Sequence, residues 1–598
     1  MTKRWRIAEP CPPDFATTVA VEPIVAQLLW NRGLRTKEAV ETFFDTEWER
    51  GTHDPEQFRH MPGAIKRVFD AIEKGEHITV HGDYDADGVT GSALLMTTLR
   101  EIEQKLNSTS QILNSKIDFY IPHRDKEGYG LHRETVGMLK ERGTQLIITV
   151  DCGIACVDEI ALAKAQGMET IVVDHHEFGE TIPDGYLIHP GLPEETYPFK
   201  KLAAVGVSYK FACALLAEAR RRGLDIPEGW EKWLLDLVAI ATVTDMVPLV
   251  GENRILQTYG LRVLNKTRRL GLRVLIESAG LTLGSLDTES VGFGIGPRIN
   301  AAGRMDHASL ALRLLLSESQ DEARELAKAL DRCNRERQET TRKMMVAAEK
   351  KSMDASARAL FFWDKDWQPA LVGLVAGKFA DRFARPSIVV GQHEGTWIGS
   401  GRSIPSYNIA EAMREVGEGI LSRVGGHAAA CGFSLKDEAL LPELARRLTH
   451  HASERLNEQD LIPELVIDGE IGLDQVHQAL VDHIATLEPF GEGNKRPVFV
   501  SRGCLVTAAD AIGSTKNHLR LTLIAPNGRR VKALGFKQGD RLFEIKVGET
   551  IDLVYHVAVN EWQGMKNIEC RIIDFVCTTP SAPTVAREAI QVPQALAS

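Results

Sequence analysis

The sequence lacks the features that define several simple classes of protein. It has no excess of positive charge, since 71 Lys and Arg face 82 Asp and Glu for a formal net charge of −11. That balance excludes a basic, sequence-blind coat protein of nucleic acids. It also lacks an apolar run of the ~20 residues that a membrane span needs. The longest clear run, residues 233–243, is interrupted by Asp236.

Cysteine is scarce as well. Nine cysteines in 598 residues are odd in number and scattered, which is typical of reduced thiols and not of a disulfide framework. Only Cys152 and Cys156 lie close together, and no second pair completes a tetrahedral zinc site. Because the N-terminal residues also lack the apolar segment of a secretory signal, we expect a cytoplasmic protein that does not bind membranes.

What is present is the composition of a folded protein with several domains. Hydrophobic residues make up 43% and charged residues 26%, near the averages of globular chains. From residue 77 onward, short Val- and Ile-rich runs alternate with amphipathic stretches of helical length. The runs are 77–80, 116–121, 145–150 and 169–173. This alternation predicts a parallel sheet with helices on both faces, a doubly wound α/β domain.

Three further segments follow the first α/β pattern. Neither Gly nor Pro occurs between Arg304 and Gln368, and residues 318–353 favour a helix of ~35 residues and ~50 Å that connects two domains. A second α/β pattern begins at residue 359. Residues 463–577 show short alternating strands with an Asn-Gly hairpin signal, which predict a small antiparallel barrel or sandwich.

The segment HGDYDADGVTG, residues 81–91, carries the densest chemistry. Its spacing from Asp83 to Gly88 matches the start of a calcium-binding EF-hand loop, but the twelfth position is Leu94 where a Glu is required. A strand also precedes the loop, so the EF-hand interpretation fails. Carboxylates this close together repel one another, and a divalent cation would remove the conflict.

Two later strands end in the same residue types. The run that ends at Val150 leads into Asp151, and the next run leads into Asp-His-His at 174–176. Ligands bind beyond the carboxyl ends of the strands in an open α/β sheet, so these side chains should meet those of residues 81–87. Together with Asp245, these carboxylates and histidines are more ligands than one metal ion needs. They suit two cations ~3.5–4 Å apart, as in phosphoryl hydrolysis, and oxygen and nitrogen ligands without thiolates favour manganese, magnesium or zinc.

Several long motifs, in order along the chain, carry a resemblance to a known family. They are HGDYDADG (81–88), EGYGL (127–131), Asp-His-His (174–176), GPRINAAGR (296–304), SGRS (400–403) and GGHAAACGF (425–433). With them the chain resembles the DHH/DHHA1 phosphoesterase family over nearly its whole length, and within that family the exonucleases specific for single-stranded DNA. The resemblance implies two α/β domains, DHH and DHHA1, joined by a long helix, with a C-terminal OB-like β-barrel.

The expected domain boundaries follow from these motifs and patterns. We expect an N-terminal region at 1–55, a DHH catalytic α/β domain at 56–265, a linking segment with the long helix at 266–353, a DHHA1 domain at 354–458, an OB-like nucleic-acid-binding domain at 459–577 and a flexible tail at 578–598.

The resemblance also implies which residues hold the metal ions. One divalent cation, Mn²⁺ or Mg²⁺, would be held by His81, Asp85 and Asp151, and the other by Asp87, Asp151, His175 and Asp245. Asp151 would bridge the two, and Asp83 matches the motif as a further metal residue. His176 would lie beside the site and assist orientation or proton transfer. The residues expected to act in catalysis are therefore Asp151, His175 and His176.

The segment GFGIGPRINAAGR, residues 292–304, is a candidate for phosphate contacts. It is not a dinucleotide-binding fingerprint, because Pro297 and Ile299 stand where glycines are required. We expect a Gly-rich turn that presents the side chains of Arg298, Asn300 and Arg304 to phosphates. The resemblance places Asn300 and Arg304 beside the scissile nucleotide, whereas Arg298 could equally be a structural ion-pair partner.

The resemblance further implies a clamp for the 5′-phosphate of the strand. The matching residues are Arg124, Ser400 and Arg402, and His427 would face the same cleft. The barrel would offer cations and an aromatic ring to a single strand, the candidates being Lys516, His518, Arg520, Arg529, Arg530, Lys532 and Trp562. Alternating exposed cations are also typical of the solvated side of a strand.

The implied activity is hydrolysis of single-stranded DNA from its 5′ end by two metal ions, with release of 5′-mononucleotides, in DNA recombination and repair. Two alternatives stay open: a related hydrolase of short RNA or nucleotide second messengers, and a scaffold that has lost its metals. The resemblance suggests a single-strand-binding protein and a RecQ-type helicase as partners, and we expect a monomer.

Overall fold

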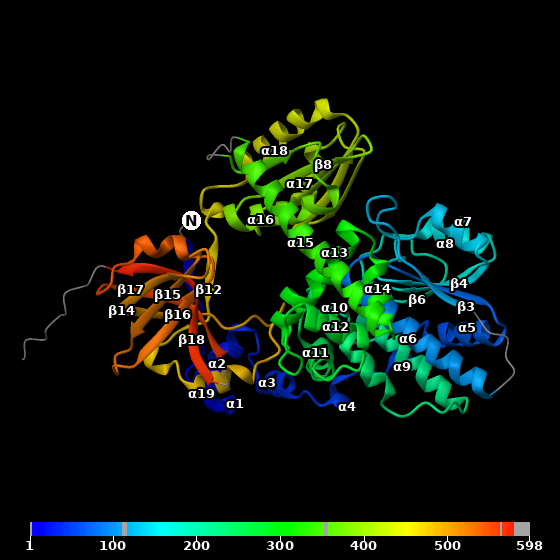
Figure 1. Cartoon of the computed structure of the whole chain (residues 1–598), viewed down its shortest axis with the longest axis horizontal. Helices are drawn as coiled ribbons and strands as arrows, with labels where there is room; N and C mark the ends of the chain where they lie inside the picture. The colour runs from blue at the N-terminus through cyan, green and yellow to red at the C-terminus, as the bar shows by residue number, and fades with distance from the viewer. Residues whose placement is uncertain (1–2, 110–115, 352–356, 563–564, 579–598) are drawn as a thin grey trace, which may run out of the picture. The chain divides into compact units, whose positions relative to one another are not determined.

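The computed structural model describes residues 3–109, 116–351, 357–562 and 565–578 (Figure 1). Two compact units make up the chain. Unit 1 comprises Met1–Arg4, Glu41–Pro463 and Pro489–Lys495, and unit 2 comprises the remaining residues. The predicted tail lies outside the described residues beyond Thr578.

The first sheet of unit 1 is parallel, as the Val- and Ile-rich runs predict. Its strands, in spatial order, are β3 (Lys116–Tyr120), β2 (His77–Gly82), β4 (Thr144–Val150), β5 (Glu169–Val173) and β6 (Tyr186–Ile188). The order reverses between β2 and β4, since the chain first adds β3 on one side and then β4 to β6 on the other. This is the topological switch point of a doubly wound sheet.

Helices cover both faces of this sheet, so the prediction of a doubly wound domain is confirmed. One face packs against α5 (Met61–Glu73), α6 (Ala86–Thr109) and α9 (Ala204–Arg221), and the other against α7 (Arg133–Glu141) and α8 (Val157–Ala165). Successive residues of one strand enter different cores: Ile148 packs with the first helix group and Ile147 with the second. Burial on both faces explains why the strands are continuously apolar.

Five helices extend this domain, and a sixth leads out of it. They are α10 (Leu235–Thr244), α11 (Gly251–Leu264), α12 (Leu270–Ser278), α13 (Gly296–Met305), α14 (Ser309–Leu316) and α15 (Gln320–Lys350). The 31-residue α15 is the predicted connecting helix. It packs on α12, α13 and α14 and also on α16 (Pro369–Phe383), which covers the next sheet. The side chain of Ser319 accepts a hydrogen bond from the Glu322 backbone N–H, which fixes where α15 begins.

The predicted Gly-rich turn at 292–304 is wrong. Residues Ser290–Ile295 form a π-helix that continues into α13, so Arg298, Asn300 and Arg304 lie on a helix. Pro297 is compatible with the first turn of α13, where its missing N–H costs nothing. The glycines before it lie in the π-helical turn, which tolerates them because the segment packs against the end of α10.

The second sheet of unit 1 is mixed. Its strands, in spatial order, are β10 (Arg423–His427), β11 (Ala430–Leu435), β9 (Thr396–Arg402), β8 (Ser387–His393) and β7 (Leu360–Trp363). Only β7 and β8 are parallel. The helices of this domain are α16 (Pro369–Phe383), α17 (Ile409–Val416) and α18 (Leu441–Arg455). The second α/β pattern is therefore confirmed.

Unit 2 holds a closed five-stranded barrel. Its strands are β14 (Phe499–Ile512), β15 (His518–Ile524), β16 (Arg530–Gly535), β18 (Met565–Thr578) and β17 (Thr550–Trp562), and β17 pairs back with β14 to close it. The predicted barrel is confirmed, although β16 and β18 pair in parallel and the sheet is not wholly antiparallel. Besides α19 (Gln478–Ala485), unit 2 contains N-terminal helices, among them α2 (Pro23–Asn31).

The remaining short elements complete the chain. They are β1 (Arg4–Ile7), α1 (Phe15–Val19), α3 (Lys37–Phe44), α4 (Trp48–Gly51), β12 (Glu464–Ile467) and β13 (Gly469–Glu470). All nine cysteines are described, and each is a free thiol, as expected.

Candidate metal centre and arginine cluster

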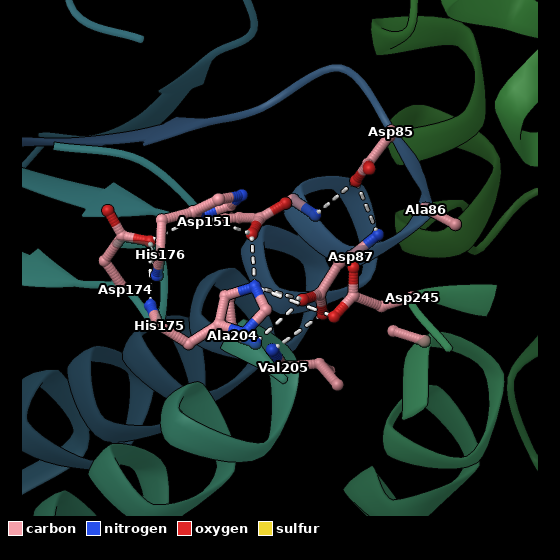
Figure 2. A network of polar contacts seen from close by, with 12 residues as sticks. Asp85, Ala86, Asp87, Asp151, Asp174, His175, His176, Ala204, Val205 and Asp245 are labelled. Atoms are coloured by element: carbon pink, nitrogen blue, oxygen red, sulfur yellow. Dashed lines mark hydrogen bonds and ion pairs between the residues drawn. The ribbon is translucent and has the colours of Figure 1, made fainter. Parts of the chain in front are cut away.

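The candidate metal ligands gather at the switch point of the first sheet (Figure 2). The loop after β2 carries Asp83 and Asp85, β4 runs directly into Asp151, and β5 runs into His175. The carboxyl ends of parallel strands lie at one edge, and the reversal of strand order opens a crevice there. The convergence expected from the sequence is thus observed.

Asp87 lies in the first turn of α6, and its carboxylate is held in place by a second helix, α9. Its carboxylate accepts hydrogen bonds from the backbone N–H groups of Ala204, at 2.7 Å, and Val205, at 2.8 Å. These are the first residues of α9, whose N-terminus favours negative charge. Burial nevertheless raises the pKa of Asp87 to about 7, with Asp85 adding repulsion.

Asp151 is the most constrained member of the site. Its backbone adopts φ +63°, a left-handed conformation that Asp tolerates better than most residues. Its Oδ1 lies 3.4 Å from His175 Nε2 and 3.6 Å from His176 Nδ1. Burial, followed by repulsion from Asp87 and Asp85, raises its pKa well above the usual range.

His175 lies at the centre of three carboxylates. Its Nε2 is 3.4 Å from Asp151, 3.6 Å from Asp245 Oδ2 and 3.8 Å from Asp87 Oδ2. Burial lowers the pKa of His175 to about 4, with a further contribution from His176. A neutral imidazole is the form that binds metals.

Three groups of potential ligand atoms, each within 4.8 Å of one another, occur among the described residues. They are Asp83, Asp85 and Asp151; Asp87, His175 and Asp245; and Asp151, His175 and His176. Asp151 belongs to two of them, the position expected of a bridging ligand. The first group contains Asp83 where the resemblance implies His81.

Several of these atoms are buried without a hydrogen-bond partner among the described residues. They are Asp83 Oδ1, Asp151 Oδ1, His81 Nε2 and His175 Nε2. A buried charge without a partner is costly, and carboxylate repulsion adds to the cost. Divalent cations would bind the unpartnered atoms and would offset the repulsion between the carboxylates. The mixed oxygen and nitrogen donors suit Mn²⁺ or Mg²⁺. The residues present therefore fit a pair of such ions.

His81 lies inside β2 and not in the loop. It is fully buried, and its Nδ1 is 3.6 Å from the Sγ atom of Cys152. Burial lowers its pKa to about 4. Its role as a ligand stays a prediction, since it belongs to none of the three groups.

Asp174 and Tyr129 orient the second histidine. His176 Nδ1 lies 2.8 Å from Asp174 Oδ1 and 3.0 Å from the hydroxyl of Tyr129, which also donates to the Asp151 carbonyl at 3.0 Å. Although burial opposes protonation, the Asp174 carboxylate raises the pKa of His176 to about 9. Neither residue was assigned a role from the sequence, although both lie in the motifs quoted above.

Helix α13 adjoins the metal loop through Asn300. The Asn300 Oδ1 accepts a hydrogen bond of 2.7 Å from the Ala86 backbone N–H, at the start of α6. Arg298 instead forms an ion pair of 2.7 Å with Asp331 of α15. The structure thus places Asn300 beside the metal loop and gives Arg298 the ion pair that the sequence left open.

Three of the predicted phosphate-binding arginines come together. Arg124 stacks on the ring of Tyr84, and Arg304 Nη1 donates to the Ala370 carbonyl at 2.6 Å. Arg402 Nη1 donates to Ser400 Oγ at 2.7 Å. Burial lowers the pKa of both Arg304 and Arg402, and repulsion from Arg124 adds to the effect, although Cys431 opposes it at Arg402. None of the three has an acidic partner within 4.0 Å in the described chain.

The remaining predicted residues lie on β10, whose partner strand β11 pairs with β9 at Arg402, and in unit 2. His427 is exposed at the end of β10, in a hairpin with β11. In unit 2, Arg520 pairs with Asp510 at 3.1 Å, and Arg529 donates to the Val476 carbonyl. The other predicted cations are exposed or half-buried on the barrel, namely Lys516, His518, Arg530 and Lys532. The side chain of Trp562 lies outside the described set.

No described helix has both the length and the apolar character to cross a membrane. Three family models match the chain. The DHH family, N-terminal domain, matches residues 77–242; the DHHA1 domain matches 354–454; and the RecJ OB domain matches 467–574.

Named proteins match over most of the chain. The single-stranded-DNA-specific exonuclease RecJ of Bacillus subtilis is 38% identical, with 96% of this chain and 70% of that protein aligned. The RecJ of Escherichia coli is 32% identical over 92% of this chain and 95% of its own length. The crystal structure of Thermus thermophilus RecJ with Mn²⁺ matches with a TM-score of 0.79 and 30% identity, covering 97% of this chain and 80% of that one.

Proposed function

The chain belongs to the RecJ family of single-stranded-DNA-specific exonucleases, and from that membership we propose that it removes nucleotides from the 5′ end of single-stranded DNA. The observation that carries the proposal is the group of unpartnered Asp and His atoms around Asp151. An inactive scaffold would not need buried carboxylates that repel one another, because neutral side chains would be more stable there.

Two divalent cations, Mn²⁺ or Mg²⁺, would stabilise negative charge on the attacking and leaving oxygens of the phosphodiester. Asp83, Asp85 and Asp151 would hold one ion, and Asp87, Asp151, His175 and Asp245 the other, while His81 remains a further candidate for the first ion. The hydrogen bonds from α9 keep the Asp87 carboxylate aimed at the site.

The protein's own residues would position the strand and move the proton. His176 is protonated near neutral pH because of Asp174, so its imidazolium is a candidate to donate a proton to the leaving oxygen. Arg304 and Asn300 would lie beside the scissile nucleotide. Arg124, Ser400 and Arg402 would hold the 5′-phosphate, for which a fork of guanidinium donors is well suited.

The test is a digest of end-labelled single strands in Mn²⁺, with and without a 5′-phosphate. We expect release of 5′-mononucleotides from the 5′ end first, a preference for the phosphorylated strand, and no release by Asp151→Asn. Release from the 3′ end first would contradict the proposed direction. Faster cleavage of dinucleotides than of long strands would instead favour a hydrolase of short nucleotides.

Further points on cellular role, location, oligomeric state and partners belong to this proposal. We infer action in recombination and repair, in the cytoplasm, as a monomer that cooperates with a single-strand-binding protein and a RecQ-type helicase. Light scattering of the purified protein would test the monomer, and co-purification would test the two partners.

A further inference from the structure

The loop between β3 and α7, residues 121–132, carries two residues that reach the metal centre. The first is Arg124, whose guanidinium carbon lies 4.4 Å from the centroid of the Tyr84 ring. Tyr84 belongs to the metal loop after β2, so Arg124 packs directly on the segment that supplies the first group of carboxylates. The ring of the neighbouring His123 lies 5.8 Å from that of His307, just beyond α13. The start of the loop is thereby placed beside the metal centre.

The second residue is Tyr129. Its hydroxyl donates a hydrogen bond of 3.0 Å to the Asp151 carbonyl and lies 3.0 Å from His176 Nδ1. The ring centroids of Tyr129 and His176 are 5.3 Å apart. Tyr129 stands between two glycines of positive φ, +86° at Gly128 and +94° at Gly130, a conformation that other residues adopt only at a cost. The backbone of the loop is therefore shaped to bring this ring to His176.

A single carboxylate holds the loop together. Glu127 Oε2 accepts a hydrogen bond of 2.6 Å from the His123 backbone N–H, and Glu127 Oε1 accepts one of 2.5 Å from the Tyr120 hydroxyl. The hydroxyl of Thr135, in the first turn of α7, donates to the same Oε1 at 3.3 Å. Hydrogen bonds to an ionised acceptor are the stronger kind. The Glu127 carboxylate thus joins the end of β3, the start of the loop and α7.

Glu127 lies between Arg124 and Tyr129 in sequence, so movement of the loop at Glu127 would displace both side chains. We propose that Glu127 is a positioning residue that fixes the 5′-phosphate contact of Arg124 and the orientation of His176 at the same time. Recognition of the strand's end and the geometry of the hydrolytic site would then depend on one loop. The inference rests on the proposed function, because it takes the 5′-phosphate of single-stranded DNA as the ligand of Arg124.

A second carboxylate of unit 1 holds a loop in a similar way and serves as the control. Glu195 lies between β6 and α9, and its Oε1 accepts hydrogen bonds from three backbone N–H groups. The donors are Thr196 at 2.7 Å, Tyr197 at 3.0 Å and Arg59 at 3.2 Å. Glu127 and Glu195 are both half-buried. Their removal therefore costs the protein comparable contacts, but only Glu127 belongs to the loop that reaches the metal centre.

The experiment compares Glu127→Ala, Glu127→Gln and Glu195→Ala with the wild type in the full chain. Steady-state cleavage of oligothymidylate that begins with a 5′-phosphate or a 5′-hydroxyl is measured in Mn²⁺. The preference for the phosphate is the ratio of the two kcat/KM values. The unfolding temperature of each protein is measured without DNA.

For Glu127→Ala we expect the preference for the phosphate to fall by about tenfold, the value of one charged hydrogen bond. The kcat for the 5′-hydroxyl strand should also fall by about tenfold, because a displaced Tyr129 no longer orients His176. Glu127→Gln should recover most of both losses, since its amide oxygen can accept from His123 and its amide nitrogen can donate to the Tyr120 oxygen. Glu195→Ala should change neither the preference nor kcat.

A preference for the phosphate that is unchanged in Glu127→Ala overturns the inference, and so does an unchanged kcat for the 5′-hydroxyl strand. Equal losses in Glu195→Ala would show a general effect of destabilisation, and a lower unfolding temperature with unchanged kinetics assigns Glu127 a structural role. If the wild-type protein releases no nucleotides, or does not prefer the phosphate, the proposed function or its clamp has failed. The wild type and the variants therefore distinguish the two failures.

Discussion

Two carboxylates in unit 1 are equally buried but have opposite surroundings. Glu252 of α11 is 1% exposed, and its Oε1 lies 2.5 Å from Lys210 Nζ while its Oε2 accepts from the Tyr197 hydroxyl at 2.6 Å. Asp151 is 2% exposed, and its Oδ1 has no donor among the described residues. A buried charge persists only when something compensates it. Glu252 is compensated by Lys210 and Tyr197 inside the protein, and we propose that bound cations compensate Asp151.

The same distinction separates the arginines. Arg298 is paired with Asp331, whereas Arg124, Arg304 and Arg402 have no carboxylate within 4.0 Å among the described residues. We therefore propose that the charges left unpaired in the interior are the ones that bind cations and phosphates. Charges that the protein pairs belong to the framework. The variants below test whether removing an unpaired charge and removing a paired charge change the stability of the protein in opposite directions.

The largest effect is expected at Asp151. Replacement by Asn keeps a side chain that tolerates positive φ but removes the shared ligand, so activity should fall by at least about 10²–10³-fold, the loss typical of one electrostatic stabiliser. The unfolding temperature of the metal-free variant should rise, because one source of repulsion is gone. End-labelled digests and thermal unfolding measure the two effects. A metal-free variant less stable than the wild type would contradict this account.

The opposite response is expected at Glu252. Glu252→Gln leaves the buried Lys210 ammonium without its partner, so we expect a loss of about 3–5 kcal/mol in the free energy of unfolding. Adding Lys210→Met should restore part of that loss. Urea unfolding followed by circular dichroism measures it, with Glu339→Gln on the exposed face of α15 as a control that changes little. A stable single variant would mean that the pair is not structural.

Divalent cations should stabilise the protein by an intermediate amount. A ligand at a hundredfold excess over its Kd adds about 2.7 kcal/mol to the stability of the folded state. Mn²⁺ titrated into the metal-free protein should therefore raise the unfolding temperature, and the rise should be much smaller in Asp151→Asn. Equal shifts in the two proteins would place the ion elsewhere.

The strands and their ends could be predicted because a strand buried on both faces reads as a continuous apolar run. Asp151 and His175 follow such runs directly, so their convergence needed only the rule for parallel sheets. The segment around Asn300 was mispredicted as a turn because its glycines suggested one. Packing against α10 stabilises a π-helix there, and packing of this kind is not visible in a single sequence.

The finer arrangement of the site depends on the directions of side chains. His81 belongs to β2, where each side chain is directed to one face of the sheet, whereas Asp83 lies in the loop that approaches Asp151. Tyr129 reaches His176 from a segment 47 residues away in sequence. No spacing along the chain encodes such a contact, and the same holds for the ion pair of Arg298 with Asp331, which forms because α15 packs on α13.

The smallest effect is expected at an exposed carboxylate that the protein pairs with cations. Arg446 and Arg447 on α18 hold the pKa of Glu443 at about 2, below its usual 4.5. Its contribution to stability should be fully present above pH 4.5 and should disappear as the pH falls from 4.5 toward 2. The unfolding midpoint of Glu443→Gln should therefore lie slightly below that of the wild type at pH 7 and pH 5.5, and the gap should narrow at pH 3.5. A gap that widens on acidification would show that this ion pair does not act as described, and solvent screening keeps the whole effect below that at Glu252.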